Sequence, residues 1–335
     1  MPQVSIIIPN YNHAAYLKER IESILNQTYT DYEIILMDDC STDNSREIIE
    51  SYRSHPKVGR ILYNEQNSGS PFRQWERGIE AAQGRFLWIA ESDDTADPHF
   101  LETLIPCLFN DYIAIAYCQS NRMSAEGMIT GNWADQTNKL YPKQFESDFC
   151  MKGAEFIDRY LLQQNVIPNA SAVLFRKSAC QAVGNMDTTI KKCGDWLFWL
   201  KLLTVGNVCF CAQSLNNYRY HTDSVIARAA KEKVVQIFEY NCAMRQAFGR
   251  YLQASPGSGQ TSFLIRKNRE ALIKAKIYFC YQWFNSERNS HPFKKLQLYI
   301  CSLKQQGVLR HIAGKYNLSL LYQHFSGKKH FEIYE

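Results

Sequence analysis

The sequence predicts an α/β fold in which a mainly parallel sheet is flanked by helices and followed by a helical C-terminal region. Three observations indicate it. Short runs of β-branched residues alternate with segments of helical periodicity through the first third of the chain. Helix start and stop signals separate these runs. Composition agrees, since 335 residues with 45% hydrophobic and 21% charged content are ordinary for a globular chain of about two domains.

The first third of the chain is expected to contain four short strands, at residues 4–8, 32–37, 60–63 and 86–90. Helical signals lie between them. Asn44 and Glu47 have the spacing of a capping box, and Pro71 suits a first helical turn. Consecutive strands that are joined by helices run parallel, because such crossovers are right-handed in nearly all sheets. We therefore expect these four strands to form one parallel sheet.

The rest of the chain divides into two parts of opposite charge. Further strands are expected at residues 113–117, 172–175 and 208–211, and a helix at 195–203. We expect residues 1–223 to form one catalytic domain and residues 224–335 a mainly helical region. The helical region carries 18 Lys/Arg and 6 Glu, a net charge of +12, whereas the first 223 residues carry −7. Such a basic region favours an anionic partner.

Cysteine usage and hydropathy indicate the compartment. The eleven cysteines include no CxxC pair, and Cys209 and Cys211 alternate as residues on one face of a strand do. This predicts reduced thiols in a cytoplasmic protein, with neither a disulfide framework nor a zinc site. No run approaches the ~20 apolar residues of a spanning helix. No basic, apolar leader precedes Val4, so we expect no signal peptide.

Polar and acidic residues follow three of the predicted strands, at residues 9–12, 38–43 and 91–94. In open α/β sheets the ligand binds beyond the carboxyl ends of the strands. Acidic clusters that converge there repel each other unless a cation or sugar hydroxyls separate them. Carboxylates are good ligands for Mg²⁺ or Mn²⁺, which in turn hold phosphates. The pattern therefore points to a nucleoside diphosphate bridged by a metal ion.

Four segments in this order resemble the family 2 glycosyltransferases of GT-A fold. They are the Val-Ser-Ile-Ile-Ile-Pro-Asn-Tyr-Asn run at residues 4–12, Asp-Asp-Cys-Ser-Thr-Asp at 38–43, Glu-Ser-Asp-Asp at 91–94 and Cys-Gly-Asp-Trp at 193–196. The resemblance covers about residues 1–225. It departs from the family at Gly194, where an acidic residue often precedes the catalytic aspartate.

The resemblance implies a nucleotide-sugar site formed by Pro9, Tyr11, Asn12, Asp39, Asn67, Arg73 and Asp93. In that family pattern Pro9, Tyr11 and Asn12 would line the base. Asp39 would hydrogen-bond the base or the ribose, and Asp93 would reach the ribose.

The same resemblance implies a metal site and a general base. Asp94 would bind Mn²⁺ or Mg²⁺ and, through the ion, the diphosphate. Glu91 with Asp93 is the alternative ligand pair. His221 would be a further ligand, as in some GT-A enzymes, or else a structural histidine. Asp195 would deprotonate the acceptor hydroxyl; the alternative for a carboxylate before an apolar helix is an N-cap.

The implied activity is inverting transfer of a sugar from a nucleotide-diphosphate sugar, with a UDP-sugar as the expected donor, to a hydroxyl of a growing cell-surface polysaccharide or lipid-linked oligosaccharide. A catalytically inactive nucleotide-sugar-binding or scaffolding module is the alternative. No nucleic-acid-binding signature accompanies the basic end. Aromatic residues among its cations predict peripheral attachment to the anionic inner face of the cytoplasmic membrane, and a helical cap on the catalytic domain is the alternative.

Overall fold

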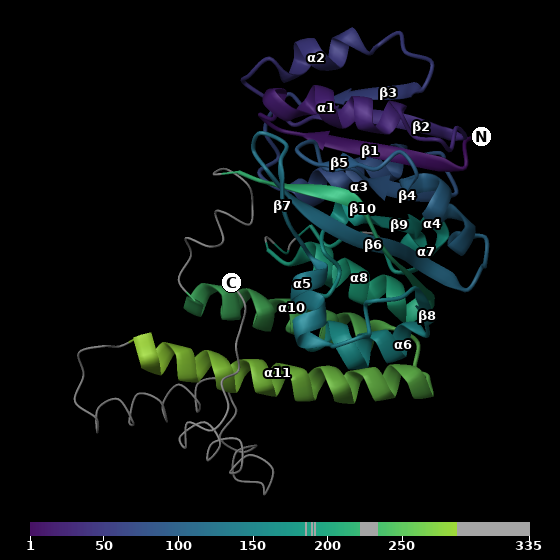
Figure 1. Cartoon of the computed structure of the whole chain (residues 1–335). Helices are drawn as coiled ribbons and strands as arrows, with labels where there is room; N and C mark the ends of the chain where they lie inside the picture. The colour runs from purple at the N-terminus through teal and green to yellow at the C-terminus, as the bar shows by residue number, and fades with distance from the viewer. Residues whose placement is uncertain (185, 189, 191, 222–233, 287–335) are drawn as a thin grey trace, which may run out of the picture.

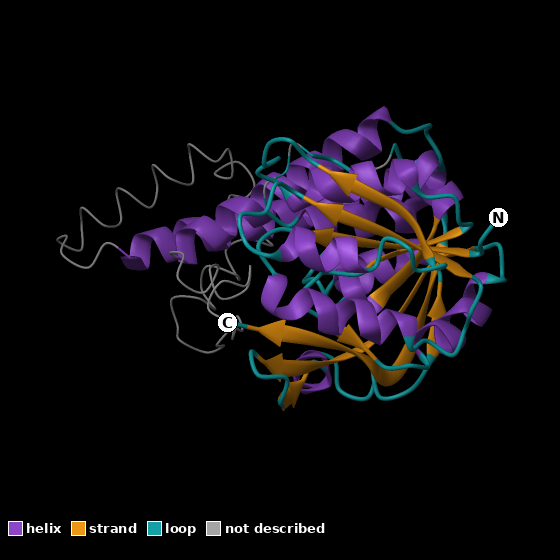
Figure 2. Cartoon of the chain, turned by 90° about the horizontal axis from the view of Figure 1, so that it is seen from above, coloured by secondary structure: helices purple, strands orange, loops and turns teal. Residues whose placement is uncertain are grey.

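The structure is a computed structural model that describes residues 1–184, 186–188, 190, 192–221 and 234–286. Ten strands within these residues form one twisted sheet with helices on both faces (Figures 1 and 2). The strand order along the main path is β3-β2-β1-β4-β9-β6-β10-β5, and β7 and β8 pair with β6 and β10. The architecture is the α/β class that the sequence predicts.

The first half of the chain follows the predicted alternation of strands and helices. Its elements are β1 (Val4–Asn10), α1 (Ala14–Leu25), β2 (Tyr32–Asp38), α2 (Ser45–Ser51), β3 (Val58–Tyr63), α3 (Pro71–Ala81) and β4 (Phe86–Ile89). All three strand pairings among β1 to β4 are parallel, as expected. Pro71 begins α3, where its missing N–H leaves no helical hydrogen bond unmade.

The second half adds antiparallel pairings. Its elements are β5 (Thr95–Ala96), α4 (Phe100–Leu108), β6 (Ile113–Ser124), β7 (Ile129–Asn132), α5 (Ala134–Leu140), β8 (Phe149–Met151), α6 (Gly153–Phe156), the π-helical turn η1 (Ile157–Leu161), the 3₁₀ turn η2 (Ala170–Ala172), β9 (Val173–Arg176), α7 (Lys177–Ala182), α8 (Gly194–Val205) and β10 (Asn207–Tyr220). β9 runs antiparallel between β4 and β6, whereas β6 and β10 are parallel. The sheet is therefore mixed.

The sheet separates two hydrophobic layers. On β1, Ile6 and Ile8 face the layer that contains α1, α2 and α4, whereas Ile7 faces the layer that contains α3 and α8. All three side chains are fully buried. Alternate residues of a strand point to opposite faces, so a continuous apolar run is what a strand covered on both sides requires. Figure 2 shows helices on both sides of the sheet.

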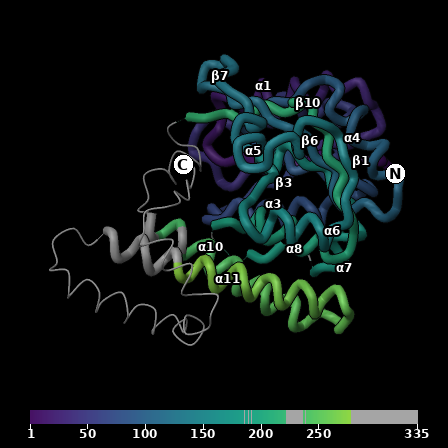
Figure 3. Tube along the Cα trace, turned by 60° about the horizontal axis from the view of Figure 1, so that its bottom comes forward, coloured from purple at the N-terminus to yellow at the C-terminus, as the bar shows by residue number. Residues whose placement is uncertain are grey.

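Two long helices, α10 (Val234–Ala254) and α11 (Gly259–Ser286), pack beside α8 (Figures 1 and 3). Met244 and Phe248 of α10 are fully buried in the hydrophobic core that includes α8. The Ser-Pro-Gly-Ser segment at residues 255–258 separates the two helices. Among the described residues, no helix has the length and apolar character to cross a bilayer. Residues 222–233 and 287–335, which carry much of the predicted basic region, lie outside the described residues.

Two local predictions are wrong. Asn44 precedes α2, but its side chain makes no capping hydrogen bond; Asp43 accepts the Ser45 N–H at 3.0 Å and the Ala14 N–H at 2.9 Å instead. The expectation of reduced thiols fails for one pair, because Cys150 and Cys209 form a disulfide between facing positions of β8 and β10. These cysteines are 59 residues apart, so no short-range pattern indicates the bond.

Candidate active site

The loops after β1, β2 and β4 meet at one edge of the sheet. Asn10 and Asp38 end neighbouring parallel strands and occupy facing positions. The Asn10 amide donates to Asp38 Oδ1 at 3.1 Å, and Arg46 donates to Asp38 Oδ2 at 3.0 Å. These hydrogen bonds show that Asp38 supports the loops after β1 and β2. The three predicted polar segments share an edge because the carboxyl ends of parallel strands lie together.

The loop after β1 starts from a buried residue and presents one exposed aromatic ring. Pro9 is buried within β1, and Tyr11 is 46% exposed. Asn12 has a φ of +56°, a conformation that asparagine tolerates better than most residues. Its Oδ1 accepts the Thr42 N–H at 2.8 Å, and its own N–H donates to Ser41 at 2.9 Å. Asn12 therefore holds the first loop against the second.

The buried carboxylate of Asp39 organises the loop that precedes α3. Its Oδ1 accepts hydrogen bonds from Asn64 at 2.5 Å, from the Ser68 N–H at 2.8 Å and from Gln74 at 2.9 Å. Its Oδ2 accepts one from the Ser68 hydroxyl at 2.7 Å. The Asp39 backbone carbonyl accepts from Asn67 at 3.0 Å. These contacts make Asp39 the anchor of residues 64–74.

Asn67 and Arg73 lie on either side of this anchor. The Asn67 side chain also accepts the N–H of Gly69, whose φ of +68° suits glycine. Arg73 is exposed on the first turn of α3, and its guanidinium donates to the Ser68 carbonyl at 3.1 Å. Both residues therefore shape the rim of the edge at which the strands end.

The acidic loop after β4 holds three carboxyl groups in different environments. Glu91 accepts the Trp75 indole N–H at 2.8 Å, and Asp94 accepts the Arg219 backbone N–H at 2.9 Å. Burial, followed by repulsion from the other two carboxylates, raises the pKa of Glu91 to about 8. Burial and repulsion from Asp93 raise the pKa of Asp94 to about 7. At neutral pH these two groups hold protons more readily than ordinary carboxyls.

Asp93 differs because two histidines face it. His221 Nε2 lies 3.1 Å from Asp93 Oδ2. Burial raises the pKa of Asp93, but the His221 hydrogen bond and the charge of His13 outweigh burial and bring this pKa below its usual value. One ligand atom each from His13, Asp93 and His221 lie within 4.8 Å of one another. The structure thus brings His221 together with Asp93, and Asp94 is not part of this cluster.

Sequence reasoning missed His13 and Arg219. His13 directly follows the predicted loop, a signal that could have been used, but its partners lie about 80 and 200 residues away in the chain. Arg219 is buried, and its Nε donates to the Asp93 carbonyl at 2.8 Å. Its Nη1 donates to the Ser124 and Ala125 carbonyls, and its Nη2 pairs with Glu19. No local sequence pattern indicates these contacts, because the partners of Arg219 lie far away in the sequence.

A second buried cation, Arg20 of α1, lies behind the acidic loop. Its guanidinium stacks over the Trp88 ring at 4.9 Å, and its nitrogens find no hydrogen-bond partner among the described residues. Burial lowers the pKa of Arg20 to about 10, although attraction to Asp94, Glu91 and Asp93 opposes this. The positive charge of Arg20 therefore offsets part of the negative charge of the loop.

Asp195 lies in the first turn of α8, and its surroundings explain the departure at Gly194. Cys193 occupies the N-cap position with a φ of +58°, so the N-cap interpretation of Asp195 is wrong. A Cβ on Gly194 would lie 2.6 Å from the Phe72 ring, so a larger residue there would require this ring to move. Asn165 donates to Asp195 Oδ2 at 3.3 Å. Burial raises the pKa of Asp195, partly offset by hydrogen bonds.

Helix α3 connects the acidic loop with Asp195. Trp75 donates to Glu91, and its ring centroid lies 6.4 Å from that of Trp199 in α8. Phe72, one turn earlier, meets Gly194 at the start of α8. Asp195 and the acidic loop are therefore adjacent to the same helix at the same edge of the sheet.

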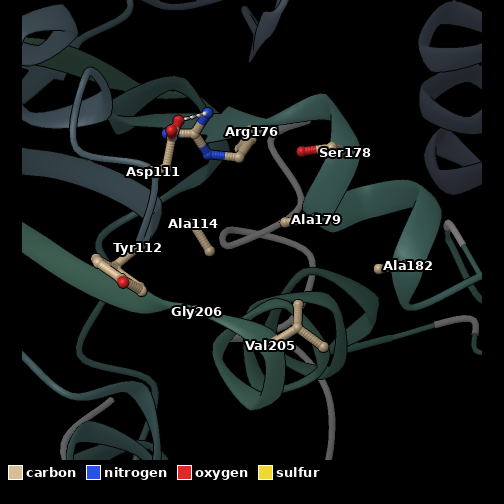
Figure 4. A pocket seen from close by; sticks show the side chains of 9 residues that line it. All are labelled: Asp111, Tyr112, Ala114, Arg176, Ser178, Ala179, Ala182, Val205 and Gly206. Atoms are coloured by element: carbon tan, nitrogen blue, oxygen red, sulfur yellow. Dashed lines mark ion pairs between the residues drawn. The ribbon is translucent and has the colours of Figure 1, made fainter.

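A separate hollow of about 180 Å³ lies at the other end of α8 (Figure 4). It is lined by Tyr112, Arg176 and Val205, among others, and Asp111 pairs with Arg176. Asp195 lies in the first turn of the helix that Val205 ends, and ten residues of helix rise about 15 Å. This hollow therefore does not belong to the edge that carries the acidic loop.

Comparison with known proteins identifies the family. The model of glycosyl transferase family 2 matches residues 5–184, a segment that ends before Asp195 and His221. TuaG of Bacillus subtilis, named for teichuronic acid biosynthesis, is 32% identical over 236 residues, which are 69% of this chain and 85% of TuaG. The glycosyltransferase GlyG of Streptococcus pneumoniae is 34% identical over 151 residues, 44% of this chain and 46% of GlyG.

Solved structures share the fold. Residues 1–349 of S. aureus TarS in complex with UDP-GlcNAc superpose with a TM-score of 0.63 at 15% identity, covering 98% of this chain and 93% of that one. The mannosyltransferase PcManGT of Pyrobaculum calidifontis, in complex with GDP-Man and Mn²⁺, gives 0.56 at 12% identity, covering 98% and 88%. Because the family model covers more than half of the sequence and TuaG is similar over most of its length, this chain belongs to glycosyl transferase family 2.

Proposed function

We propose that this glycosyltransferase transfers a sugar with inversion from a nucleotide-diphosphate sugar and that Asp195 is the general base. The observation that carries the proposal is that Asp195 and the acidic loop lie beside the same helix, α3. The first turn of a helix favours an ionised carboxylate. Burial raises the pKa of Asp195, which makes its carboxylate a stronger proton acceptor.

A divalent ion fits the residues at this edge. Asp93 and His221 offer a carboxylate oxygen and an imidazole nitrogen 3.1 Å apart, and we assign them as ligands. Glu91 and Asp94, which the family resemblance suggests, would support the loop, since each already accepts a hydrogen bond. The bound ion, Mn²⁺ or Mg²⁺, would neutralise negative charge on the departing diphosphate.

The reaction would be a single displacement. The acceptor hydroxyl gives its proton to Asp195 while its oxygen attacks the anomeric carbon from the side opposite the diphosphate. The bond to the diphosphate oxygen breaks in the same step, so the configuration inverts. The nucleotide would lie on the loops after β1 and β2, with the exposed Tyr11 ring against the base. Beneath it would lie Pro9 at the end of β1, the loop residues Asn12, Asp39 and Asn67, and Arg73 on the first turn of α3.

The relatives suggest the substrate class. TarS was solved with UDP-GlcNAc and with UDP, which supports a UDP-sugar as donor, and PcManGT was solved in complex with GDP-Man and Mn²⁺. TuaG is named for the biosynthesis of teichuronic acid. We therefore propose a hydroxyl of a growing cell-surface glycan as acceptor.

The test is a panel of nucleotide sugars, each added with and without Mn²⁺, with thermal shift and nucleotide release as readouts. We expect one donor to stabilise the protein only with Mn²⁺ and to release its nucleoside diphosphate. Donor-dependent stabilisation without any release, across a range of glycan acceptors, would instead support a binding module. Absence of both responses would contradict the proposed donor class.

A further inference from the structure

We infer that His13 is a third protein ligand of the divalent ion, so that His13, Asp93 and His221 form a site that binds first-row transition metal ions in preference to Mg²⁺. The inference rests on the metal-dependent transfer proposed above. It goes further because it adds a ligand that no family motif supplies and names the class of ion.

The geometry of the three side chains supports this. Their ligand atoms lie within 4.8 Å of one another. An octahedral ion with bonds of about 2.1 Å separates its ligands by roughly 3 Å in cis and 4 Å in trans. Small side-chain movements would therefore bring all three onto one ion. The centroids of the His13 and His221 rings are 5.6 Å apart and the rings are nearly perpendicular, so they meet edge to face and are not stacked.

The position of His13 supplies an independent argument. It occupies the N-cap of α1, where Ser, Thr, Asp and Asn are strongly preferred because their side chains accept helix N–H groups. The His13 side chain makes no capping hydrogen bond, and Asp43 accepts the Ala14 N–H instead. His13 thus departs from the residue types preferred at an N-cap, and Asp43, distant in the sequence, binds the helix N–H group. Departures of this kind are expected at functional sites.

Neighbouring residues hold the two imidazoles in place. Ser92 Oγ lies 2.8 Å from His13 Nδ1. The Tyr16 ring packs against both histidines, with ring centroids 6.2 Å from His13 and 5.0 Å from His221. Arg219 in turn stacks over Tyr16 at 4.7 Å. Contacts of this kind orient metal-binding histidines and tune their affinity.

Ligand chemistry then determines the preferred ion. Mg²⁺ favours oxygen ligands, whereas imidazole nitrogen suits first-row transition metals, whose affinities rise from Mn²⁺ through Co²⁺. A site with two nitrogens and one carboxylate should therefore hold Mn²⁺ or Co²⁺ more tightly than Mg²⁺. His13 also follows the proposed nucleotide loop directly, so one segment would contact both the base and the ion.

The experiment measures Mn²⁺ binding to the metal-stripped full chain, with affinity taken from the EPR signal of free Mn²⁺ and ligand identity from ¹⁴N couplings in pulsed EPR. We expect couplings from two imidazoles in the wild type. His13→Gln should lose one coupling and bind Mn²⁺ at least about tenfold more weakly, the loss that even supporting residues produce. His55→Gln is the matched control, because His55 lies before β3 and outside the cluster.

Two further measurements complete the test. His13→Asp replaces nitrogen by oxygen, so it should bind Mn²⁺ with one imidazole coupling and allow Mg²⁺ to compete at lower excess than in the wild type. Unchanged couplings and affinity in His13→Gln, or equal competition by Mg²⁺ in the wild type and His13→Asp, would overturn the inference. Transfer that still needs a metal would then leave the proposed function standing. A wild type that binds no Mn²⁺ and transfers sugar in EDTA would contradict metal dependence as well.

Discussion

The backbone N–H of Arg219 donates to Oδ1 of Asp94 at 2.9 Å and so ties the end of β10 to the acidic loop after β4. The Arg219 guanidinium strengthens this connection through the Asp93 carbonyl at 2.8 Å. His221 follows only two residues later and faces Asp93. Arg219 therefore joins, through its backbone and its side chain, the acidic loop that carries Asp93 to the strand end that precedes His221.

Arg219→Met should destabilise the protein and weaken its metal site. The change leaves the carbonyls of Asp93, Ser124 and Ala125 without their donor, and an unsatisfied buried group costs about 1–3 kcal/mol. We expect the free energy of unfolding in urea to fall by about 2–5 kcal/mol, with a weaker thermal shift on Mn²⁺ addition.

Arg122→Met is the control for Arg219→Met. Arg122 lies on the neighbouring strand β6, is exposed, and stacks over the Tyr220 ring at 4.3 Å. Exposed contacts of this kind contribute about 0.5–1 kcal/mol. Equal losses of stability in the two variants would show that Arg219 does not clamp the acidic loop.

The metal-free protein should lose stability as the pH rises from about 4 to about 8. The pKa values of Glu91 and Asp94 are about 8 and about 7 in the fold, above those of ordinary carboxyls. The folded state therefore binds more protons than the unfolded state in this window, and stability falls with pH. Urea midpoints of the EDTA-treated protein should show this slope. Glu91→Gln should flatten it, and an identical slope in that variant would exclude Glu91 as its source.

Asn165→Ala should shift the acid limb of the pH–rate profile to higher pH. Asn165 donates to Asp195, and this hydrogen bond lowers the pKa of Asp195 against the effect of burial. Without it the pKa rises further, and the base is protonated over a wider range of pH. Profiles of kcat for the wild type and Asn165→Ala check this. A uniform loss of rate without a shift would mean that Asn165 acts only on local structure.

Much of the fold could be predicted from the sequence, because short local patterns indicate the strands and helices of its first half. Each early strand is a continuous apolar run and each helix shows its own periodicity, as in β1 and α1. β9 was expected as a strand, but its antiparallel insertion between β4 and β6 depends on contacts across the chain. The capping box at Asn44 failed for the same reason, since Asp43 also bonds Ala14, 29 residues earlier.

The candidate site, like the fold, could be predicted only where the signal lies in neighbouring residues of the sequence. The acidic loop could be recognised because it directly follows a strand signal, whereas Asp195 was assigned as a base through the family resemblance. The partners of these residues could not, since Trp75, Asn165 and Arg219 reach them only through the folded sheet. Asp39 was expected to contact the nucleotide; that role remains a prediction, and its carboxylate also anchors residues 64–74.

The basic helix α11 should bind anionic membranes if the predicted peripheral attachment is right. Lys267 pairs with Asp158 at 3.2 Å, whereas Arg266, Arg269 and Lys274 are exposed. Each cation near an anionic leaflet contributes about 1 kcal/mol, and salt screens the attraction. We expect co-sedimentation with anionic but not neutral vesicles, and less at high salt. Changing the three exposed residues to Gln should reduce it.

The control for this variant removes the same charge elsewhere. It changes three exposed cations of the N-terminal half to Gln: Lys18, Arg53 and Arg60. If both variants reduce sedimentation equally, net charge and not α11 is responsible. Negligible sedimentation with either kind of vesicle would support the cap interpretation, which the packing of α10 against α8 also favours.

The most direct test of the proposed function is the transfer rate of Asp195→Asn at saturating donor and Mn²⁺. This change keeps the size of the side chain and removes its basicity. A general base contributes about 10²–10⁴-fold, so we expect the rate to fall by that factor while donor binding and the urea midpoint stay near those of the wild type. Transfer within tenfold of the wild-type rate would contradict the assignment of Asp195 as the base.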